Sequence, residues 1–492
     1  VTFSQLQGGR KAVVEAEEIL NDETLTQLVR TTGFTPTILK NQNAKVSVAY
    51  CARSENSSST VSVSVDDINA GQFAIVQASK SLIGTYAYER EFKYSFYPKN
   101  NTIDFEVLFD NADRGSTGWL NFIRINVKRP LEIHGDELMF RNPEKYQSEY
   151  KRRFEITNAS QDISVYDVSD RHNIERINTQ LNGGVLSFND DASEIREYVA
   201  LKTNGNFPKP KIEGEIENQN LHALDNIDMV ILSPKEFLGE GMANDLYELH
   251  SDQGLNVLLV TPEEIYNEFS SGQRDITAIR WFLKMLYDRG TNEDDLLKYL
   301  LIFGDGTYDN RAHSENEHNK IMTYQSDESL HQANTFVSDD YYGILDDYEG
   351  SLGSNDKVDI GIGRYPVRTV QEAKAMVTKT KYYLQNINRN MWKNTVCFVA
   401  DDGDNNTHMY DANRMADKVM KNHPDMIVDK ILLDAYQQVV ESSGPSYPDA
   451  NKALGKNINK GVILLNYSGH GGVTGLTDEK IITKNIINNK SK

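Results

Sequence analysis

The chain has few cysteines and no long apolar run, and each absence excludes a class of protein. Its 492 residues include only two cysteines, Cys51 and Cys397. Two cysteines this far apart make neither a disulfide framework nor a zinc site. No apolar stretch approaches the ~20 residues that a membrane-spanning helix needs. The chain begins at Val1 without a basic segment followed by an apolar one, so we expect a removed signal peptide or an engineered segment.

Positive charge is also in short supply. There are 52 Lys and Arg residues against 72 Asp and Glu residues, which gives a formal net charge of −20 and a pI near 5.0. This balance disfavours nucleic acid and anionic membrane surfaces as partners, because both repel an acidic chain. A basic partner is compatible with it, but solubility explains it more simply. The length predicts more than one domain.

The first part of the chain, residues 1–206, has the alternating pattern of β-strands. Apolar residues alternate with polar ones in runs such as Val61–Val65, which is the two-residue period of half-buried strands. Turn-forming clusters such as Asn182–Gly184 separate the runs. A helical pattern is confined to about Asp22–Thr31. We expect an antiparallel sandwich or barrel, which ends before the two prolines of Phe207–Pro210.

From residue 211 onward, strands alternate with helices. Near-continuous apolar strands separated by helices predict a mainly parallel sheet that is covered on both faces. We divide this part into two α/β subdomains, residues 211–385 and residues 386–492. The expected strands are Met229–Leu232, Leu255–Val260, Tyr299–Phe303, Ile360–Ile362, Val396–Ala400, Ile427–Leu433 and Val462–Asn466. The expected helices are about Lys235–His250, Ile276–Tyr287, Val370–Gln385, His408–Asn422 and Pro448–Lys456, and another begins at Pro262.

Polar, glycine-containing segments follow three of these strands: Gly304–Gly306, Asp401–Asp404 and Gly469–Gly471. In a parallel α/β sheet, functional sites form at the carboxyl ends of the strands. If the last two strands are near neighbours, a carboxylate meets the imidazole of His470 and can fix its tautomer. The glycines that flank His470 let backbone N–H groups approach a substrate. The third group should be a nucleophile, and for this layout a thiol.

The acidic segment also suits two roles outside catalysis. Asp401, Asp402 and Asp404 are favourable at a helix N-terminus ahead of the His408 helix, because acids stabilise that end of a helix. They also suit calcium, which prefers oxygen ligands. On these residues alone, a helix cap, a calcium site and catalytic support are comparable in weight.

The remaining candidates carry weaker signals. Gly304–Gly306 lacks the Gly-Lys-Ser/Thr of a phosphate loop, which disfavours nucleotide binding. Cys397 lies within an apolar strand, where a cysteine is usually an inert packing residue. Cys51 lies in the β-rich part, far in sequence from His470. Neither cysteine is therefore the expected nucleophile.

Five motifs in the second part of the chain occur in a specific order and spacing. They are Leu301–Gly306, Ser338–Gly343, Asp359–Val367, Val399–Gly403 and Asn466–Gly471. On these motifs the chain, from roughly residue 211 to its end, resembles the gingipain family of cysteine peptidases. Within that family it is most similar to a sortase-like branch that belongs to the type IX secretion system. The β-rich part also resembles the N-terminal region of that branch, notably in Asn121–Asn126 and Arg129–Leu131, which favours the branch over ordinary gingipains.

The resemblance assigns roles to particular residues. His470 is the catalytic histidine, Asp402 matches the supporting acid, and the backbone N–H of Gly471 helps to form the oxyanion hole. The family requires no cofactor, although members often bind calcium as a structural ion. Candidate calcium ligands are Asp339, Asp340 and Asp404.

The resemblance also predicts that the nucleophile is missing. The family's cysteine ends one more strand after the histidine, but only 22 residues follow His470 (492 − 470 = 22), and none is a cysteine. They include a helix-like stretch at about Glu479–Asn489. We therefore expect the chain to be an N-terminal fragment without peptidase or transpeptidase turnover.

The implied activity is that of a sortase-like cysteine peptidase at the bacterial outer membrane, outside the cytoplasm. The intact enzyme would cleave C-terminal sorting signals and transfer the secreted protein to a surface amine or to water. Its partners would be secreted proteins with C-terminal sorting domains and outer-membrane secretion-system proteins. One alternative is a gingipain-type endopeptidase, which would have an acidic pocket for Arg or Lys. Another is a catalytically dead adhesin or docking module, which the missing cysteine would suit.

Overall fold

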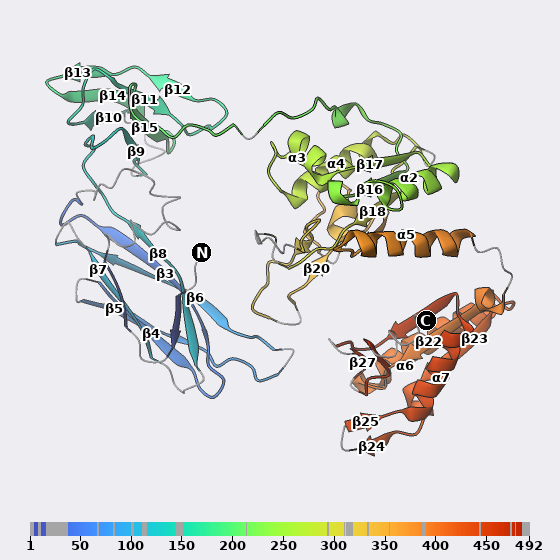
Figure 1. Ribbon diagram of the computed structural model, residues 1–492. Coiled ribbons are helices and arrows are strands. Elements are labelled where there is room, and N and C mark those ends of the chain that lie inside the picture. Colours follow the sequence, from blue (N-terminus) through green and yellow to red (C-terminus); the bar gives the residue numbers. More distant parts are fainter. Residues whose placement is uncertain are drawn as a thin grey trace. The chain divides into compact units, whose positions relative to one another are not determined.

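The computed structural model describes residues 4–7, 11–15, 38–65, 68–81, 84–99, 103–110, 116–143, 151–212, 214–292, 295–308, 310, 318–331, 334–353, 355–385, 390–441, 444–472, 475–477 and 479–484. The chain divides into two compact units, Val1–Lys374 and Ala375–Lys492 (Figure 1). The boundaries predicted at residues 206–211 and 385–386 stay predictions, and the helix predicted at about Asp22–Thr31 lies outside the described residues. Among the described helices, none has the length and apolar character that crossing a membrane requires.

Two antiparallel four-stranded sheets form a sandwich in the first part of the chain. One has the order β1-β8-β3-β6 and the other β2-β7-β4-β5. Every second residue of β4 is buried, as the alternating sequence predicts, and these residues share one core with β3 of the other sheet. The strands are β1 (Ser4–Gln7), β2 (Lys11–Glu15), β3 (Ala44–Arg53), β4 (Ser59–Val65), β5 (Ile68–Ile75), β6 (Tyr88–Phe96), β7 (Asp104–Asp110) and β8 (Thr117–Asn126).

A second, smaller pair of antiparallel sheets follows, with a hydrophobic core of its own. Its sheets have the orders β10-β14-β13 and β12-β11-β15-β9. Phe140, Phe154, Phe188 and Tyr198 pack together in this core. The β-rich part is thus built on two cores in sequence. The strands are β9 (Glu137–Arg141), β10 (Lys151–Ile156), β11 (Ile163–Asp167), β12 (Glu175–Ile177), β13 (Gln180–Asn182), β14 (Val185–Asp191) and β15 (Glu197–Lys202).

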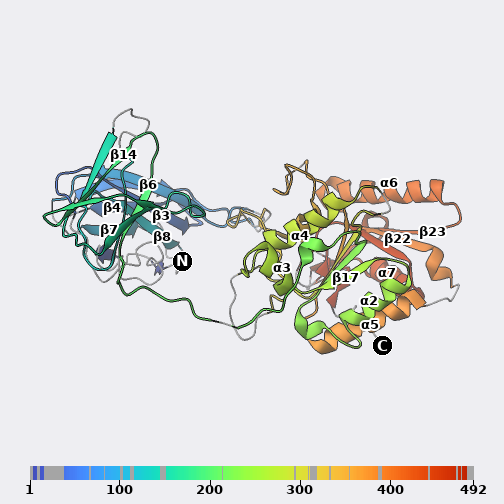
Figure 2. The same ribbon diagram turned by 90° about the horizontal axis from the view of Figure 1, so that it is seen from above.

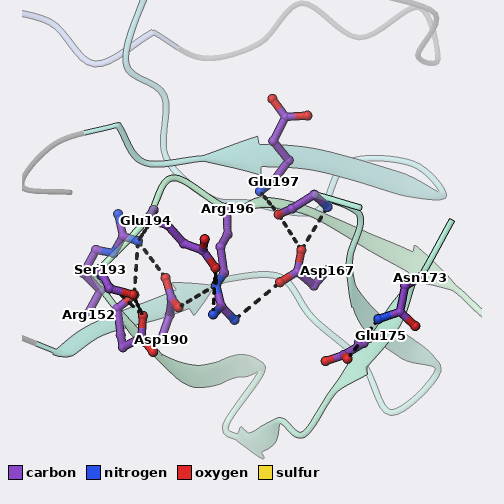
Figure 3. Close-up of polar contacts among 11 residues, drawn as sticks. Arg152, Asp167, Asn173, Glu175, Asp190, Ser193, Glu194, Arg196 and Glu197 are labelled. Carbon is purple, nitrogen blue, oxygen red and sulfur yellow. Dashed lines mark hydrogen bonds and ion pairs between the residues drawn. The ribbon is translucent and has the colours of Figure 1, made fainter. Parts of the chain in front are cut away.

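A buried ion pair fastens β10 to β14. Arg152 Nη2 lies 2.8 Å from Asp190 Oδ2, and the two side chains are only 12% and 2% exposed. Figure 3 shows Arg196 approaching the same carboxylate and reaching Asp167, at 3.8 and 3.6 Å. Arg152 also donates to the carbonyls of neighbouring residues. This pairing satisfies a carboxylate that would otherwise be buried without a counter-charge.

The first α/β sheet has four parallel strands in the order β17-β16-β18-β21. Helix α3 begins with a capping box, in which Thr261 and Glu264 bond each other's backbone N–H groups, and Asp275 caps α4. The elements are β16 (Met229–Leu232), α2 (Ala243–Asp252), β17 (Val257–Val260), α3 (Pro262–Phe269), α4 (Ile276–Arg289), β18 (Tyr299–Phe303), β19 (Tyr324–Gln325), β20 (Val337–Ser338), β21 (Gly361–Tyr365) and α5 (Val370–Gln385).

Glu268 of α3 fastens the short 3-10 helix η1 (Leu221–Ala223) to this sheet's helical layer. Its oxygens accept hydrogen bonds from the N–H of Leu221 at 2.6 Å, from Gln219 Nε2 at 2.9 Å and from the N–H of His222 at 3.1 Å. Burial alone would raise the pKa of Glu268, but these bonds outweigh it and lower the pKa to about 2.

The second α/β sheet lies in the unit Ala375–Lys492 and has the parallel order β23-β22-β26. Alternate residues of the central strand face opposite helices. Val396 and Phe398 pack with Ala416 of α6, whereas Cys397 packs with Leu454 of α7. Figure 2 gives a second view of these helices. The elements are β22 (Thr395–Ala400), α6 (Thr407–Asn422), β23 (Ile427–Leu432), β24 (Val439–Glu441), β25 (Gly444–Ser446), α7 (Pro448–Lys460), β26 (Leu464–Ser468), β27 (Gly475–Leu476) and β28 (Ile482–Thr483).

The structure confirms the predicted fold class, a β-rich part followed by an α/β part with parallel sheets, and it corrects two segments. The helix predicted at Lys235–His250 is interrupted, because Gly239 and Gly241 adopt φ values of +113° and +76° ahead of α2. Within the helix-like stretch predicted at Glu479–Asn489, Ile482–Thr483 form the strand β28, which pairs with β27, and residues 485–489 lie outside the described residues.

Candidate active site

Parallel pairing of β22 with β26 brings two loops together. Ala400 lies opposite Ser468 at the ends of these strands, and the N–H of Asp401 donates to the carbonyl of Ser468 at 3.0 Å. The acidic segment therefore leaves the sheet beside the segment that carries His470. The two strands are neighbours, which is the condition under which the sequence predicts that a carboxylate meets His470.

Asp404 is the carboxylate that contacts the imidazole of His470. His470 Nε2 lies 2.5 Å from Asp404 Oδ2, and His408 Nε2 lies 3.2 Å from the same oxygen. The two imidazole rings are perpendicular, with centroids 5.3 Å apart. Hydrogen bonds from His470 first and His408 second lower the pKa of Asp404, so this group is ionised at neutral pH.

An unusual turn directs Asp404 toward His470. Asp404, Asn405 and Asn406 have φ values of +52°, +56° and +64°, and α6 begins at the next residue. Asp and Asn tolerate this left-handed conformation better than other residues with side chains. Thr407 Oγ1 donates to the carbonyl of Asp404 at 2.7 Å and ties the turn to the helix.

Asp402, which the sequence analysis assigned as the supporting acid, is bonded elsewhere. Its Oδ2 accepts a hydrogen bond from Tyr447 Oη at 2.5 Å. Oxygens of Asp401, Asp402 and Glu479 lie within 4.8 Å of one another. Burial raises the pKa of Glu479, and the neighbouring carboxylates add to this. The physical reason for the difference is the left-handed turn, which brings Asp404 to Nε2 of His470; a catalytic role for Asp402 stays a prediction.

The loop after β26 is shaped by close backbone contacts. Gly469 has φ +152°, and Tyr467 Oη donates to the carbonyl of His470 at 2.5 Å. The N–H of Thr477 donates to the same carbonyl at 3.0 Å, and Gly472 N–H donates to Gly475 at 2.8 Å. These two backbone hydrogen bonds involve the residues on either side of Gly471, and neither uses the N–H of Gly471. The predicted oxyanion role of Gly471 stays a prediction.

Both cysteines are buried. Cys397 is fully buried on β22, and Asn457 Nδ2 donates to its Sγ at 3.4 Å. Burial raises the pKa of the Cys397 thiol and, in the first sandwich, raises that of Cys51 to about 11. Neither thiol is suited to act as a nucleophile, as the sequence analysis expects.

Three of the motifs that carry the family resemblance meet at Arg364. Its guanidinium holds both oxygens of Asp339 at 2.7 Å and donates to the carbonyl of Gly304 at 2.7 Å. The side chains of Arg364 and Asp339 are 12% and 22% exposed. These motifs therefore share a structural role, a bidentate ion pair at the end of β18. This role was not predicted from the sequence, although the order of the motifs was a signal for it.

By sequence the chain belongs to a family of cysteine peptidases. A sequence model of peptidase family C25 matches residues 222–492, more than half of the chain, and the chain belongs to this family, which is the family of the gingipains. No curated protein matches.

Among solved structures, dimeric latent PorU from Porphyromonas gingivalis is similar with a TM-score of 0.63 and 22% sequence identity. The match covers 82% of this chain and 40% of that chain, so this chain spans less than half of that protein's length. The likeness shows a shared fold, which includes the β-rich part.

Two weaker matches are a delta-endotoxin from Bacillus thuringiensis and a tandem of carbohydrate-binding modules from Paenibacillus barcinonensis. The first has a TM-score of 0.17 and 11% identity and covers 26% of this chain and 20% of that one. The second has a TM-score of 0.13 and 10% identity and covers 41% of this chain and 86% of that one. Scores this low carry no argument about fold or function.

Proposed function

We propose that the chain is part of a sortase-like cysteine peptidase that acts at the cell surface of a bacterium. Its substrates are secreted proteins, whose C-terminal sorting signals it removes with the help of outer-membrane secretion-system proteins. The observation that carries the proposal is the contact between His470 Nε2 and Asp404 Oδ2, at the carboxyl edge of a parallel sheet in a family C25 chain.

The reaction is an acyl transfer. A cysteine thiolate attacks the scissile carbonyl carbon, the C–N bond breaks, and His470 gives a proton to the leaving amine. The resulting thioester is attacked by a surface amine or by water, which passes a proton to His470 as the thiolate leaves. Asp404 orients the imidazole, and the N–H of Gly471, which the hairpin bonds leave unused, stabilises the oxyanion.

The edge of β26 is where we place the strand that ends in this cysteine. Within the described residues, β26 pairs with β22 on one side only. Ile463, directly before β26, and Leu464, its first residue, are 43% and 50% exposed, which is unusual for apolar residues of a central strand. A further parallel strand at this edge would cover them and would end beside His470. The longer chain of the P. gingivalis protein is consistent with this arrangement.

A longer form of the protein that includes the cysteine tests the proposal. It is incubated with a peptide that ends in a sorting signal, with and without an added amine, and the products are identified by mass spectrometry. We expect a hydrolysed product in water and an amide product with the amine. His470→Ala should reduce kcat/KM by ~10²–10⁴-fold. The 492-residue chain should show no turnover; rapid labelling of it by an active-site thiol probe, lost in His470→Ala, would contradict the assignment.

The same protein distinguishes the two acids. Asp404→Asn should lower kcat/KM on one sorting-signal peptide by roughly tenfold, less than His470→Ala, because Asp404 is 59% exposed and solvent weakens the interaction. Asp402→Asn should have a smaller effect, because Asp402 is bonded to Tyr447. If the order of the two effects is reversed while both variants stay folded, Asp402 is the supporting acid.

The gingipain-type alternative is tested by the same assay. An endopeptidase of that type would cleave internal Arg or Lys peptides at least as fast as a sorting-signal peptide and would form no amide product. An adhesin or docking module would cleave neither peptide even when the cysteine is present.

A further inference from the structure

Asp404 and two histidines place their ligand atoms close together. Asp404 Oδ2, His408 Nε2 and His470 Nε2 all lie within 4.8 Å of one another. Asp404 and His408 are four residues apart at the start of α6, so one helical turn presents both, while His470 comes from the loop after β26. The supporting acid of the proposed site therefore has two imidazoles on one oxygen. A catalytic acid needs only one.

We propose that Asp404, His408 and His470 bind a divalent transition-metal ion of the zinc class, and that the ion holds the enzyme inactive. Two imidazoles and a carboxylate are the donor set that zinc takes in open sites, with a fourth position left for water. Calcium and magnesium prefer all-oxygen sites, so the two nitrogens select against them.

Two of the three separations between donor atoms are close to those around such an ion, and the third, between the two Nε2 atoms, is within 4.8 Å. Tetrahedral zinc with ligands at about 2.0–2.1 Å has neighbouring ligand atoms about 3.3 Å apart. Asp404 Oδ2 and His408 Nε2 already lie 3.2 Å apart. Asp404 Oδ2 and His470 Nε2 lie 2.5 Å apart and must separate by a fraction of an ångström. Because His470 is 69% exposed, its side chain can make this movement without repacking a core.

The site is also partly ordered in advance. The left-handed turn and the bond from Thr407 fix the backbone of Asp404, and His408 is 28% exposed and so is held by its surroundings. Ionised Asp404 provides the negative charge that attracts a cation. Binding displaces the protons that the two imidazoles share with Asp404, so affinity should fall as pH falls.

The consequence for activity rests on the proposed function. A metal ion on Nε2 of His470 occupies the lone pair that carries the proton to the leaving amine. The ion also binds the carboxylate of Asp404, which then no longer orients the imidazole of His470. Removal of the ion would then restore an acid–imidazole pair in working geometry, so metal availability would control the enzyme.

The binding claim is tested on the 492-residue chain, which needs no activity. The chain is titrated with Zn²⁺ by calorimetry and with Co²⁺ by visible absorption, which reports tetrahedral coordination. We expect one ion per chain. His408→Gln and Asp404→Asn should each weaken binding by more than the roughly 10–100-fold that loss of an outer-shell partner costs. His423→Gln, a change at the other end of α6, is the matched control and should bind as the parent chain does.

Separate outcomes bear on the two proposals. Absence of one-to-one binding, or equal binding by His408→Gln and the parent chain with unchanged circular dichroism, overturns the metal site. In the longer, cysteine-containing protein, Zn²⁺ should inhibit turnover of the parent and of His423→Gln, and His408→Gln should need at least tenfold more Zn²⁺ for the same inhibition. Binding to the chain without any turnover of the longer protein would leave the metal site in place and contradict the proposed function.

Discussion

Gly469 sets the position of His470, and its replacement by alanine gives a sharp test of the site. Gly469 has φ +152°, a region that only glycine populates freely. A Cβ atom there would lie against Tyr467 Oη and 2.5 Å from Cβ of Asp401, whereas real Cβ atoms essentially never approach other atoms closer than 3.0 Å. Tyr467 Oη donates to the carbonyl of His470, so the clash acts directly on the loop that carries His470.

The cost can be worked out from these contacts. The backbone conformation should cost about 1–3 kcal/mol for a residue with a side chain. Overpacking against Tyr467 and Asp401 adds about 1–3 kcal/mol, and loss of the bond to His470 adds about 0.5–1.5 kcal/mol. Because relief of one strain partly relieves the others, we expect a total of about 3–5 kcal/mol, which corresponds to a Tm decrease of roughly 10–20 °C.

Calorimetric unfolding of the whole chain measures this, since the unit Ala375–Lys492 should contribute its own transition. Gly472→Ala is the matched control in the same loop, because among the described residues a Cβ there would meet only the carbonyl oxygen of Gly475, at 3.8 Å. It should change stability by less than about 0.5 kcal/mol. Equal effects of the two substitutions, or no effect of Gly469→Ala, would refute the idea that Gly469 is required by geometry.

Three further predictions follow from buried groups. Arg152→Ala should destabilise the second pair of β-sheets by about 1.5–3 kcal/mol in urea unfolding, since Asp190 stays buried and the remaining counter-charge, Arg196, is 3.8 Å away. Arg153→Ala, at an exposed ion pair, should cost less than about 1 kcal/mol; similar costs would contradict this. Cys397 should react slowly with a thiol reagent in the native chain, and rapid modification would show that β22 is not packed as described. The pKa of Glu268 falls from 4.5 to about 2 on folding, so its stabilising effect is present above pH 4.5 and is lost as pH falls toward 2. In Glu268→Gln the free energy of unfolding should therefore decrease less between pH 4.5 and pH 2 than in the parent chain. An unchanged dependence of stability on pH would rule the contribution out.

The elements near the candidate site could largely be predicted from the sequence. The apolar run before His470 predicted a strand ending there, and β26 ends at Ser468. The helix predicted at His408–Asn422 is α6, which begins one residue earlier. Long apolar or periodic segments predict secondary structure well, because a helix or strand that buries one face needs apolar residues at a regular spacing.

The partners of these elements were harder to predict. Alternation in the β-rich part shows which residues are buried but not which strands share a core, so the division of this part into two cores was not predicted. Asp404, rather than Asp402, contacts His470 because the three residues from Asp404 to Asn406 adopt a left-handed conformation. No periodicity in the sequence reveals such a turn. The pair Asn405-Asn406 and the four-residue spacing of Asp404 and His408 were the available signals.

The pairing of β22 with β26 also determines when the site can form during folding. Asp404 and His408 are neighbours on one helical turn, so their contact can form as soon as α6 does. His470 lies 66 residues beyond Asp404 and reaches it only after β23 and α7 have been synthesised and β26 has docked in parallel beside β22. Parallel pairing across such a separation is slow, because the entropy of closing the loop is lost before any contact compensates for it. In a nascent or half-folded chain we therefore expect Asp404 to contact His408 first, and the contact between Asp404 and His470 to be one of the last to form.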